Sequence, residues 1–372
     1  MTTTTESHAA SPSPDSRHRT GLVRRVVAVI DERMGIGALK YPVPEHSNRL
    51  AWSLGGLTAV SLVVLIVTGM ALAQWYSPYP TDANQSVRDI MTDVPGGAFI
   101  RDIHFWAAQA MYVLAGLHLL RVFLTASYKK PREGNYLIGV SMFVLTFLAI
   151  FTGSVLKWDQ EGFEALGHNI AAAELLGPAG SFFTPEFAPD ISVLARIYAA
   201  HVAIIPILIV VLLFLHVLLI KRHKISPHPL LPDTGDGQAP ACEPTEPFTQ
   251  HLRRISAFGL ALVGILGLLA LVVPTGIGTP PASGLEITTP LWQFWPMFTL
   301  ENWIGLPGIL WGSAGLFGVL FIVPFIDRNP SRDPRRRKVA LALGALFLIA
   351  YIALTLMMLL QPAQEHLEMM GA

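Results

Sequence analysis

The chain has 372 residues, of which 52% are hydrophobic and only 14% are charged, and its mean hydropathy is +0.49. So little charge cannot solvate an ordinary globular surface, and the composition therefore predicts a protein embedded in a lipid bilayer. The 26 basic and 26 acidic residues cancel, which argues against a nucleic-acid partner, and the single Cys242 excludes an internal disulfide, Cys-ligated zinc and iron–sulfur clusters.

The chain opens with a tail that contains no apolar segment. Residues 1–20 are rich in Thr, Ser, Pro and His, which is typical of disorder, and they lack the apolar core of a signal peptide. The lead-in at 21–49 places Arg24 and Arg25 among apolar residues between Leu22 and Met34. This mixture predicts a helix on the cytoplasmic membrane surface, with a simple soluble lead-in as the alternative.

Seven charge-free runs follow, and each can supply the roughly 20 residues that cross about 30 Å of hydrocarbon. They are 50–81 (membrane part about 50–75), 103–120, 134–156, 197–220, 255–285 (membrane part about 255–273), 302–326 and 339–364. The sequence therefore predicts an all-α integral membrane protein with seven transmembrane helices and with its two termini on opposite sides of the bilayer.

A linker divides these helices into two groups. Residues 225–252 contain six prolines and two glycines, a composition that is typical of a connecting segment. We expect a four-helix domain at 50–224, a cytoplasmic linker at 225–252, a three-helix domain at 253–364 and a tail at 365–372.

The distribution of basic residues predicts the orientation of the chain. If the N-terminus is cytoplasmic, 22 of the 26 Lys and Arg residues fall in cytoplasmic segments, as the positive-inside rule requires. The opposite side keeps Arg88, Arg101, Lys157 and Arg196, and its longest loop, 157–195, is acidic. We expect the prokaryotic cytoplasmic membrane, with the N-terminus in the cytoplasm and the C-terminus outside.

Only four of the twelve histidines lie within predicted spans. His104 and His118 are 14 residues apart on the second span, about 3.9 turns and roughly 21 Å, so both rings project from nearly one face at two depths. His201 and His216 are 15 residues apart on the fourth span, which turns the second ring about 60° further round, and a kink at Pro206 would absorb this offset.

The second and fourth spans run in the same direction, so their histidines match in depth. We expect His104 with His201 to form an outer pair and His118 with His216 an inner pair, each holding one haem iron through two imidazoles. Two axial nitrogens leave the iron no open position and favour electron transfer. The alternative is four structural histidines, which the high cost of polar groups in lipid disfavours.

Glycines repeat the same spacing on two other spans. Gly55 and Gly69 on the first span and Gly139 and Gly153 on the third are again 14 residues apart. Small residues at two depths would let flat haem macrocycles approach the backbone, although such glycines also mark close helix packing.

Basic residues lie near the ends of both histidine helices. We expect Arg101 and Arg196 to pair with the propionates of the outer haem, and Lys221 and Arg222 with those of the inner haem. Snorkelling to the membrane interface and the positive-inside rule are the alternative explanations.

The chain resembles the first four helices of the cytochrome b/b6 family in three stretches, IRDIHFWAAQAMYVLAGLHLLRVFLTASYKKPRE, LTFLAIFTGSVLKWDQEGFEAL and ARIYAAHVAIIPILIVVLLFLHVLLIKRHKIS. The 15-residue spacing on the fourth span and the total of seven spans resemble the chloroplast and cyanobacterial form. In that form the second half is a separate subunit, which residues 255–360 resemble as a fused segment. The resemblance covers residues 35–360, strongly in the first half and weakly in the second.

This resemblance implies a transmembrane path for electrons from quinol through two non-covalent b-type haems. It implies a homodimer that pairs with a Rieske iron–sulfur protein and a c-type cytochrome, as in a bc-type quinol:cytochrome c reductase. It also implies an outer site that oxidises quinol and an inner site that reduces quinone. By position alone, His223, Lys224 and Arg253 are candidates for the inner site.

Two positions depart from the family pattern. Members with a covalently attached third haem carry Cys where this chain has Ser53, so we expect no thioether-bound third haem. The outer quinone motif Pro-Glu-Trp-Tyr corresponds here to Pro290–Gln293, with Leu291 in place of the carboxylate. We expect Pro290 and Trp292 to line the outer quinone site.

The missing carboxylate leaves the base for quinol oxidation to be assigned. Asp159, in the turn after the third span, is the preferred candidate, and Glu286 and Glu301 flank the altered motif. An ordinary helix-end carboxylate is the alternative role for Asp159.

Two other functions stay open. The altered motif favours a dihaem membrane anchor that passes quinol electrons to another enzyme, such as a molybdenum nitrate reductase. A non-redox transporter would need charged or discontinuous segments at mid-membrane, and the cores of the predicted spans contain no Asp, Glu, Lys or Arg.

Overall fold

A computed structural model describes residues 41–231 and 243–361, together with 25, 28–29 and 32–33. The tails expected at 1–20 and 365–372, and most of the helix expected between Leu22 and Met34, lie outside these residues.

Within the described ranges, seven helices are long and apolar enough to cross a membrane. They are α2 (Leu50–Leu72), α4 (Gly97–Leu124), α5 (Glu133–Leu156), the continuous segment Val193–His223, α9 (Phe248–Val272), α11 (Pro307–Ile326) and Lys338–Leu360. The all-α fold class with seven membrane helices is therefore confirmed.

The remaining elements are short. The continuous fourth helix comprises α7 (Val193–Ala199), a π-helical turn η6 (Ala200–Ile204) and α8 (Ile205–His223), and the last comprises α12 (Lys338–Met357) and η9 (Met358–Leu360). Other helices are α3 (Ala83–Thr92), α6 (Gln160–Leu175) and α10 (Trp295–Ile304). Single 3₁₀ turns are η2 (Glu45–Asn48), η3 (Gly177–Ala179), η4 (Ser181–Phe183), η5 (Pro185–Phe187), η7 (Trp292–Phe294) and η8 (Pro334–Arg336), and the strands are β1 (Pro42–Pro44) and β2 (Thr245–Pro247).

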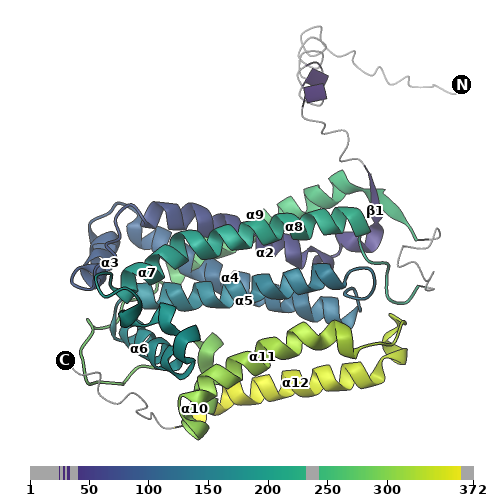
Figure 1. Cartoon of the computed structure of the whole chain (residues 1–372). Helices are drawn as coiled ribbons and strands as arrows, with labels where there is room; N and C mark the ends of the chain where they lie inside the picture. The colour runs from purple at the N-terminus through teal and green to yellow at the C-terminus, as the bar shows by residue number, and fades with distance from the viewer. Residues whose placement is uncertain (1–24, 26–27, 30–31, 34–40, 232–242, 362–372) are drawn as a thin grey trace, which may run out of the picture.

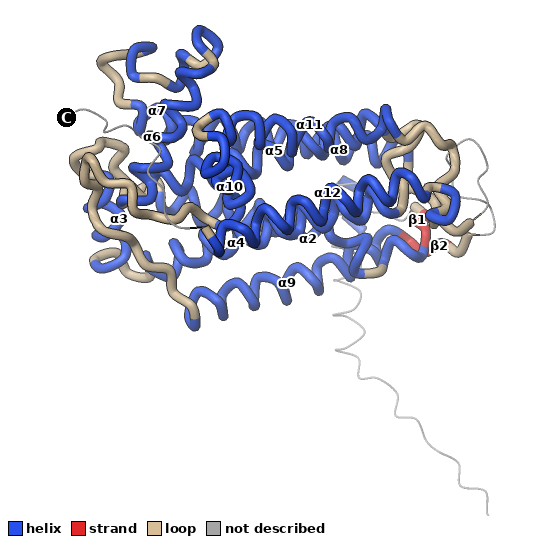
Figure 2. Tube along the Cα trace, turned by 90° about the horizontal axis from the view of Figure 1, so that it is seen from below, coloured by secondary structure: helices blue, strands red, loops and turns tan. Residues whose placement is uncertain are grey.

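A four-helix bundle of α2, α4, α5 and α8 forms the centre of the molecule (Figures 1 and 2). α2 packs along α4, α5 packs along α8, and α4 contacts α5. α9 covers α2 and α4, while α11 packs on α5. Large apolar side chains face outward, including Leu260 and Val339, which are 74% and 75% exposed, as expected for helices surrounded by lipid.

The short elements gather at the two ends of the helices (Figure 1). α3, α6 and α10 lie at one end, with the last described residues, and β1 lies at the other. We call these the outer and inner ends, following the orientation predicted from charge.

The sixth membrane helix is shorter than the sequence predicted. Gly305 adopts a φ of +74° and ends α10 at Ile304, and Pro307 then opens α11. The expected run at 302–326 is therefore broken after its first turn, and α10 becomes a separate helix at the outer end.

The fifth helix begins inside the predicted linker. β2 pairs antiparallel with β1, and the Phe248 N–H donates to the Tyr41 carbonyl at 2.9 Å. This short pairing holds the start of α9 next to the start of α2.

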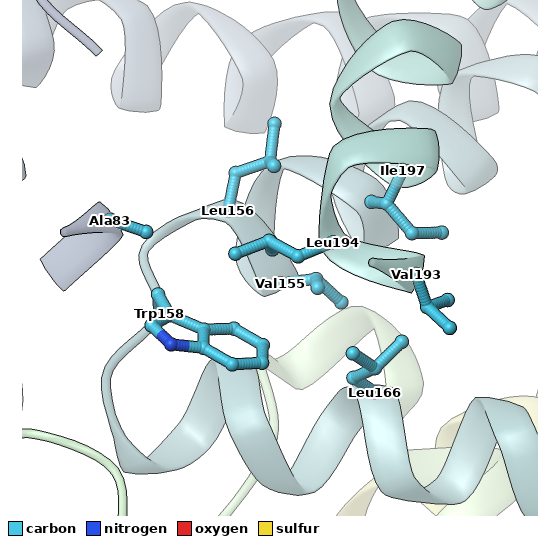
Figure 3. Close-up of a cluster of buried hydrophobic side chains, with 8 residues drawn as sticks. All are labelled: Ala83, Val155, Leu156, Trp158, Leu166, Val193, Leu194 and Ile197. Carbon is cyan, nitrogen blue, oxygen red and sulfur yellow. The ribbon is translucent and has the colours of Figure 1, made fainter. Parts of the chain in front are cut away.

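An apolar cluster consolidates the outer end of the bundle (Figure 3). α3, α5, α6, α7 and the turn between α5 and α6 contribute its buried residues, which are Ala83, Val155, Leu156, Trp158, Leu166, Val193, Leu194 and Ile197. The Trp158 indole also donates to the Pro80 carbonyl at 2.9 Å. The loop helix α6 is therefore packed onto the ends of the membrane helices.

Hydrogen bonds join the C-terminal half to the outer face of the bundle. The segment 273–290 lies between α9 and η7 and accepts hydrogen bonds from two arginines of the first half. Arg88 donates to the Gly278 carbonyl at 2.8 Å. Arg101 donates to the Thr275 and Gly276 carbonyls at 2.8 and 3.0 Å. At the inner end, Arg337 of the second half donates to the Phe123 carbonyl of α4 at 3.2 Å. The two halves are thus connected at both ends.

Candidate functional site

The outer histidine rings lie side by side inside the bundle. The ring centres of His104 on α4 and His201 in the π-helical turn are 6.3 Å apart, with an interplanar angle of 63°. Two imidazoles that ligate one metal ion at the ordinary distance of about 2 Å have ring centres about 6 Å apart. The spacing therefore suits one ion between the two rings.

Each outer ring is oriented by a threonine. His104 Nδ1 lies 2.9 Å from the Thr68 hydroxyl, and His201 Nδ1 lies 2.9 Å from the Thr152 hydroxyl. Both hydroxyls already donate to backbone carbonyls of their own helices, at 2.7 Å and 2.9 Å. Their oxygens therefore accept from the Nδ1–H of each ring, which leaves both Nε2 lone pairs available as ligands.

The four predicted glycines lie against the four histidine rings, one to each. A Cβ atom at Gly69 would stand 3.2 Å from His104 Cε1, and the corresponding distances are 3.0 Å for Gly153 and His201, 3.0 Å for Gly55 and His118, and 3.6 Å for Gly139 and His216. The prediction assigned this space to the macrocycles. The structure shows that the imidazole rings themselves occupy it, since each ring crosses from one helix onto the backbone of its neighbour.

The inner rings are held differently. His216 Nδ1 donates to the Asn135 carbonyl at 3.1 Å, which leaves its Nε2 available. His118 Nδ1 lies 3.3 Å from Nη2 of Arg121. Because a guanidinium can only donate, this contact uses the Nδ1 lone pair of His118 and places the ring proton on Nε2, so ligation of an iron by Nε2 requires Arg121 to turn away from Nδ1. Among the described residues, the inner rings make no ring contact like that of the outer pair.

Arg121 is a site residue that sequence reasoning missed. It follows His118 by one helical turn, its guanidinium lies 5.8 Å from the Trp52 ring centre, and its buried Nε has no hydrogen-bond partner. The signal was present, since Arg121 ends the charge-free run that contains His118. The predicted Lys221 and Arg222 are both exposed.

The two arginines predicted to pair with the outer haem donate their hydrogen bonds to backbone carbonyls. Arg101 donates to Thr275 and Gly276, and Arg196 donates to Phe182 and Thr184 at 2.6 and 2.7 Å. The buried Nε of Arg196 has no partner, so one donor of this side chain stays available.

The altered quinone motif packs directly on the histidine helix α4. The Trp292 indole donates to Gln109 Oε1 at 2.9 Å, and Gln293 Nε2 donates to the same oxygen at 2.5 Å. Trp292 also meets the Tyr112 ring edge-on, with centres 5.6 Å apart. The Pro290 carbonyl accepts from the Trp295 indole at 2.8 Å. The motif therefore borders α4 within two turns of His104.

The carboxylate of Asp159 is used in hydrogen bonds that hold the local structure together. Its carboxylate caps α6 by accepting from the Gly162 N–H at 3.0 Å, and it accepts from the Gly278 N–H at 2.9 Å. The side chain is 2% exposed and lies 3.4 Å from Lys157. One carboxylate oxygen therefore caps α6 and the other holds the loop 273–290 beside it.

A second carboxylate site lies deeper at the outer end. His168 Nε2 on α6 is 3.2 Å from Glu286 and 3.3 Å from Glu301, which is 0% exposed. His168 Nδ1 donates to the Glu164 carbonyl at 2.9 Å. Burial lowers the pKa of His168, but the neighbouring carboxylates of Glu286 and Glu301 outweigh it and raise this pKa to about 10.

A cluster at the inner end contains none of the three residues suggested for the inner site. His46 Nδ1 lies 2.5 Å from Glu243, and the His46 ring meets those of Trp52 and His228 at 5.1 and 5.5 Å. Burial and the neighbouring His228 lower the pKa of His46 to about 4. The cluster reaches Arg121 through Trp52.

Comparison with known proteins decides the family. Residues 38–224 match the family model described as Cytochrome b/b6/petB. The chain belongs to the cytochrome b/b6 family. It is 38% identical over 207 residues to cytochrome b6 of Heliobacterium mobile, which covers 53% of this chain and 97% of that protein. It is 37% identical over 206 residues to cytochrome b6 of Acaryochloris marina, with 53% and 95% covered.

The fold of this cytochrome b/b6 member extends over nearly the whole chain. A solved structure titled Hyperthermophilic respiratory Complex III matches with a TM-score of 0.75 over 91% of this chain and 92% of that chain, at 22% identity. The b6 relatives match about half of the chain, whereas this similarity in fold includes the three C-terminal helices.

Membership in the cytochrome b/b6 family implies that haem b is the cofactor, and the outer histidine pair fits it. The 6.3 Å ring separation, the two Nδ1 donors directed at hydroxyls, and two free Nε2 atoms make a suitable donor set for a six-coordinate iron. Thr68 and Thr152 each precede the glycine that contacts a histidine, a repeated Thr-Gly pair that sequence reasoning overlooked.

Proposed function

We propose that this chain carries electrons from quinol across the bilayer through two bis-histidine b haems, as the cytochrome b subunit of a bc-type quinol:cytochrome c reductase. The proposal rests mainly on the outer pair. The ring centres of His104 and His201 are 6.3 Å apart, a separation that suits one iron between them. Their Nδ1 atoms are fixed by Thr68 and Thr152.

The chain's own residues would hold and orient the cofactors. His104 with His201, and His118 with His216, would each hold one haem iron, while Gly69 and the other three glycines leave room for the imidazole rings. Haem supplies one-electron chemistry at its iron, and two protein ligands keep that iron closed to oxygen.

Basic side chains supply the charges that anionic propionates require. Arg101 and Arg196 are the candidates at the outer haem, and Arg121 is a better placed inner candidate than Lys221 or Arg222, because its Nε is buried without a partner. Buried donors of this kind favour a charged acceptor.

The complex we propose contains a homodimer of this chain, a Rieske iron–sulfur protein and a c-type cytochrome, in a prokaryotic cytoplasmic membrane. Basic residues gathered on one side support a cytoplasmic N-terminus and an outside C-terminus. The chain combines a b6-like half, 50–224, and a second half, 253–364, joined by the segment 225–252, whose last residues already belong to α9.

Two quinone sites follow from the same assignment. Pro290 and Trp292 border the outer site beside α4, and the cluster of His46, His228 and Glu243 next to Trp52 is the candidate inner site.

Removing one ligand at a time tests the proposal. His104→Ala and His201→Ala should each remove the same haem, and His118→Ala and His216→Ala should each remove the other. The measurement is the haem-to-protein ratio with a redox titration of the remaining haem. The pairing is wrong if His104→Ala and His201→Ala remove different haems, and the whole proposal fails if the purified protein has no b-type absorbance.

Leu291, in place of a carboxylate, favours a second candidate function, a dihaem anchor that delivers quinol electrons to a molybdenum oxidoreductase. Identification of the subunits that remain bound after purification in mild detergent separates the two. A Rieske protein supports the reductase, and a molybdenum subunit supports the anchor.

A further inference from the structure

Glu301 is the most deeply buried carboxylate at the outer end, and its environment calls for a function. Its side chain is 0% exposed, and both carboxylate oxygens lack a partner that meets hydrogen-bond geometry. A buried carboxylate without such partners costs free energy that packing alone does not recover. Groups of this kind are found where a protein handles protons.

His168 connects Glu301 to a second carboxylate. Its single Nε2 atom lies 3.3 Å from Glu301 and 3.2 Å from Glu286, while its Nδ1 donates to the Glu164 carbonyl. Glu301 is 0% exposed and Glu286 is 10% exposed. The two carboxylates therefore share one nitrogen of His168, and Glu286 is the more exposed of the two.

Glu301 lies on the same buried face as a residue of the altered quinone motif. Gln293, Met297 and Glu301 follow one another at intervals of four along η7 and α10, and all three are at most 3% exposed, so they share a face. Gln293 donates to Gln109 of the histidine helix. Phe298 packs both on His168, with ring centres 5.1 Å apart, and in the cluster that contains Trp292.

Glu164 holds the segment that carries Glu286 in place. Its carboxylate accepts from the N–H groups of Ile287 and Thr288 at 2.9 and 3.0 Å, directly after Glu286. Glu164 is therefore a positioning residue, which aims Glu286 at His168.

We propose that Glu301, His168 and Glu286 form a proton relay that takes a proton from quinol at the outer site and releases it at the outer surface. The relay rests on the proposed quinol oxidation and would supply the base that Leu291 cannot. It handles protons only, since the two electrons leave by the proposed haem and Rieske route.

The steps balance in protons and charge. The quinol O–H bond breaks and an O–H bond forms on the Glu301 carboxylate. The His168 imidazolium gives its Nε2 proton to Glu286, and Nε2 then takes the proton from Glu301. Glu286 finally releases its proton to water, which restores the imidazolium and both carboxylates. The raised pKa of His168, about 10, keeps the imidazolium charged at neutral pH.

Few other charges face this cluster. α6 contributes Glu164, and also Glu161, which pairs with Lys157 at 2.5 Å. The sequence of α11 contains no ionisable side chain, and α12 has Lys338 at its inner end. The pH response of the relay therefore depends on its own three members and on Glu164.

The test is the rate at which quinol reduces the haems of the purified complex. We expect Glu301→Gln to slow this rate about 100-fold, and His168→Gln and Glu286→Gln about tenfold or more, as for loss of a positioned proton acceptor. Glu174→Gln, the same change at an exposed position of α6, is the matched control and should leave the rate unchanged. Haem content and reduction by dithionite, which needs no quinol site, should stay intact in every variant.

Infrared difference spectroscopy supplies a second readout. Addition of quinol to the unmodified complex should produce a protonated-carboxyl band that Glu301→Gln lacks. A Glu301→Gln rate within about twofold of the control, or no such band in the unmodified complex, would overturn the relay. If dithionite but not quinol reduces the haems of the unmodified complex, the proposed function itself fails.

Discussion

His201 and His216 are separated by 15 residues, and a π-helical turn from Ala200 to Ile204 contains the first of them. A π-helical turn adds one residue to an α-helix without adding a turn. The spacing of 15 is thereby equivalent to an α-helical spacing of 14, which is the spacing of His104 and His118. The structure thus removes the 60° offset with an inserted residue directly before Pro206, where the sequence suggested a proline kink.

Loss of the threonine hydroxyls should weaken the outer haem selectively. Thr68→Val and Thr152→Val each remove the acceptor for a histidine Nδ1–H, and such partners typically contribute about 10–100-fold to metal-site affinity. We expect haem to dissociate more easily from the outer site, with a shifted midpoint potential for that haem alone. Thr146→Val, whose hydroxyl bonds only to its own helix, is the control. Equal behaviour of Thr146→Val and Thr152→Val would contradict the prediction.

A methyl group should be tolerated unequally at the four glycines. At Gly153 the added Cβ would lie 3.0 Å from the His201 ring, whereas at Gly139 it would lie 3.6 Å from His216, an ordinary contact. Gly153→Ala should therefore reduce the haem content of the outer site, and Gly139→Ala should leave the inner haem bound. Haem-to-protein ratio and redox titration measure both. The reverse order of effects would show that ring contact does not control tolerance at these positions.

Arg121, more than Lys221 or Arg222, should control the inner haem. Arg121→Gln removes a charge beside His118 and should lower the midpoint potential of the inner haem, because a nearby cation favours the reduced iron. Lys221→Gln and Arg222→Gln alter exposed side chains and should have little effect, since solvent screens them. A larger shift in Lys221→Gln than in Arg121→Gln would refute this assignment.

Because of the His168 cluster, the stability of the outer end should fall as the pH rises above neutral. Glu286 and Glu301 raise the pKa of His168 from 6.5 to about 10, so its charged form stabilises the folded state fully below pH 6.5. That contribution is lost as pH rises through about 10. The temperature at which haem absorbance disappears should therefore fall between pH 7 and roughly 10 in the unmodified protein and fall less in His168→Gln. Parallel curves for the two proteins would contradict the prediction.

The sequence alone determined the features that follow from hydropathy and helical period. Charge-free runs of sufficient length predicted seven membrane helices, because each must satisfy its own backbone within lipid. The separations of 14 and 15 residues paired four buried histidines by depth, and the glycine spacing pointed to the same two levels.

Only the tertiary structure decided what each candidate side chain contacts. The sequence favoured Asp159 over Glu301 as the outer base. In the structure, however, the Asp159 carboxylate accepts from the N–H groups of Gly162 and Gly278, while Glu301 is buried beside His168. This difference arises because α6 and α10, more than 100 residues apart in sequence, meet at one end of the bundle. Hydropathy records which residues enter the membrane, but contacts between distant segments depend on how the loops fold over the helix ends.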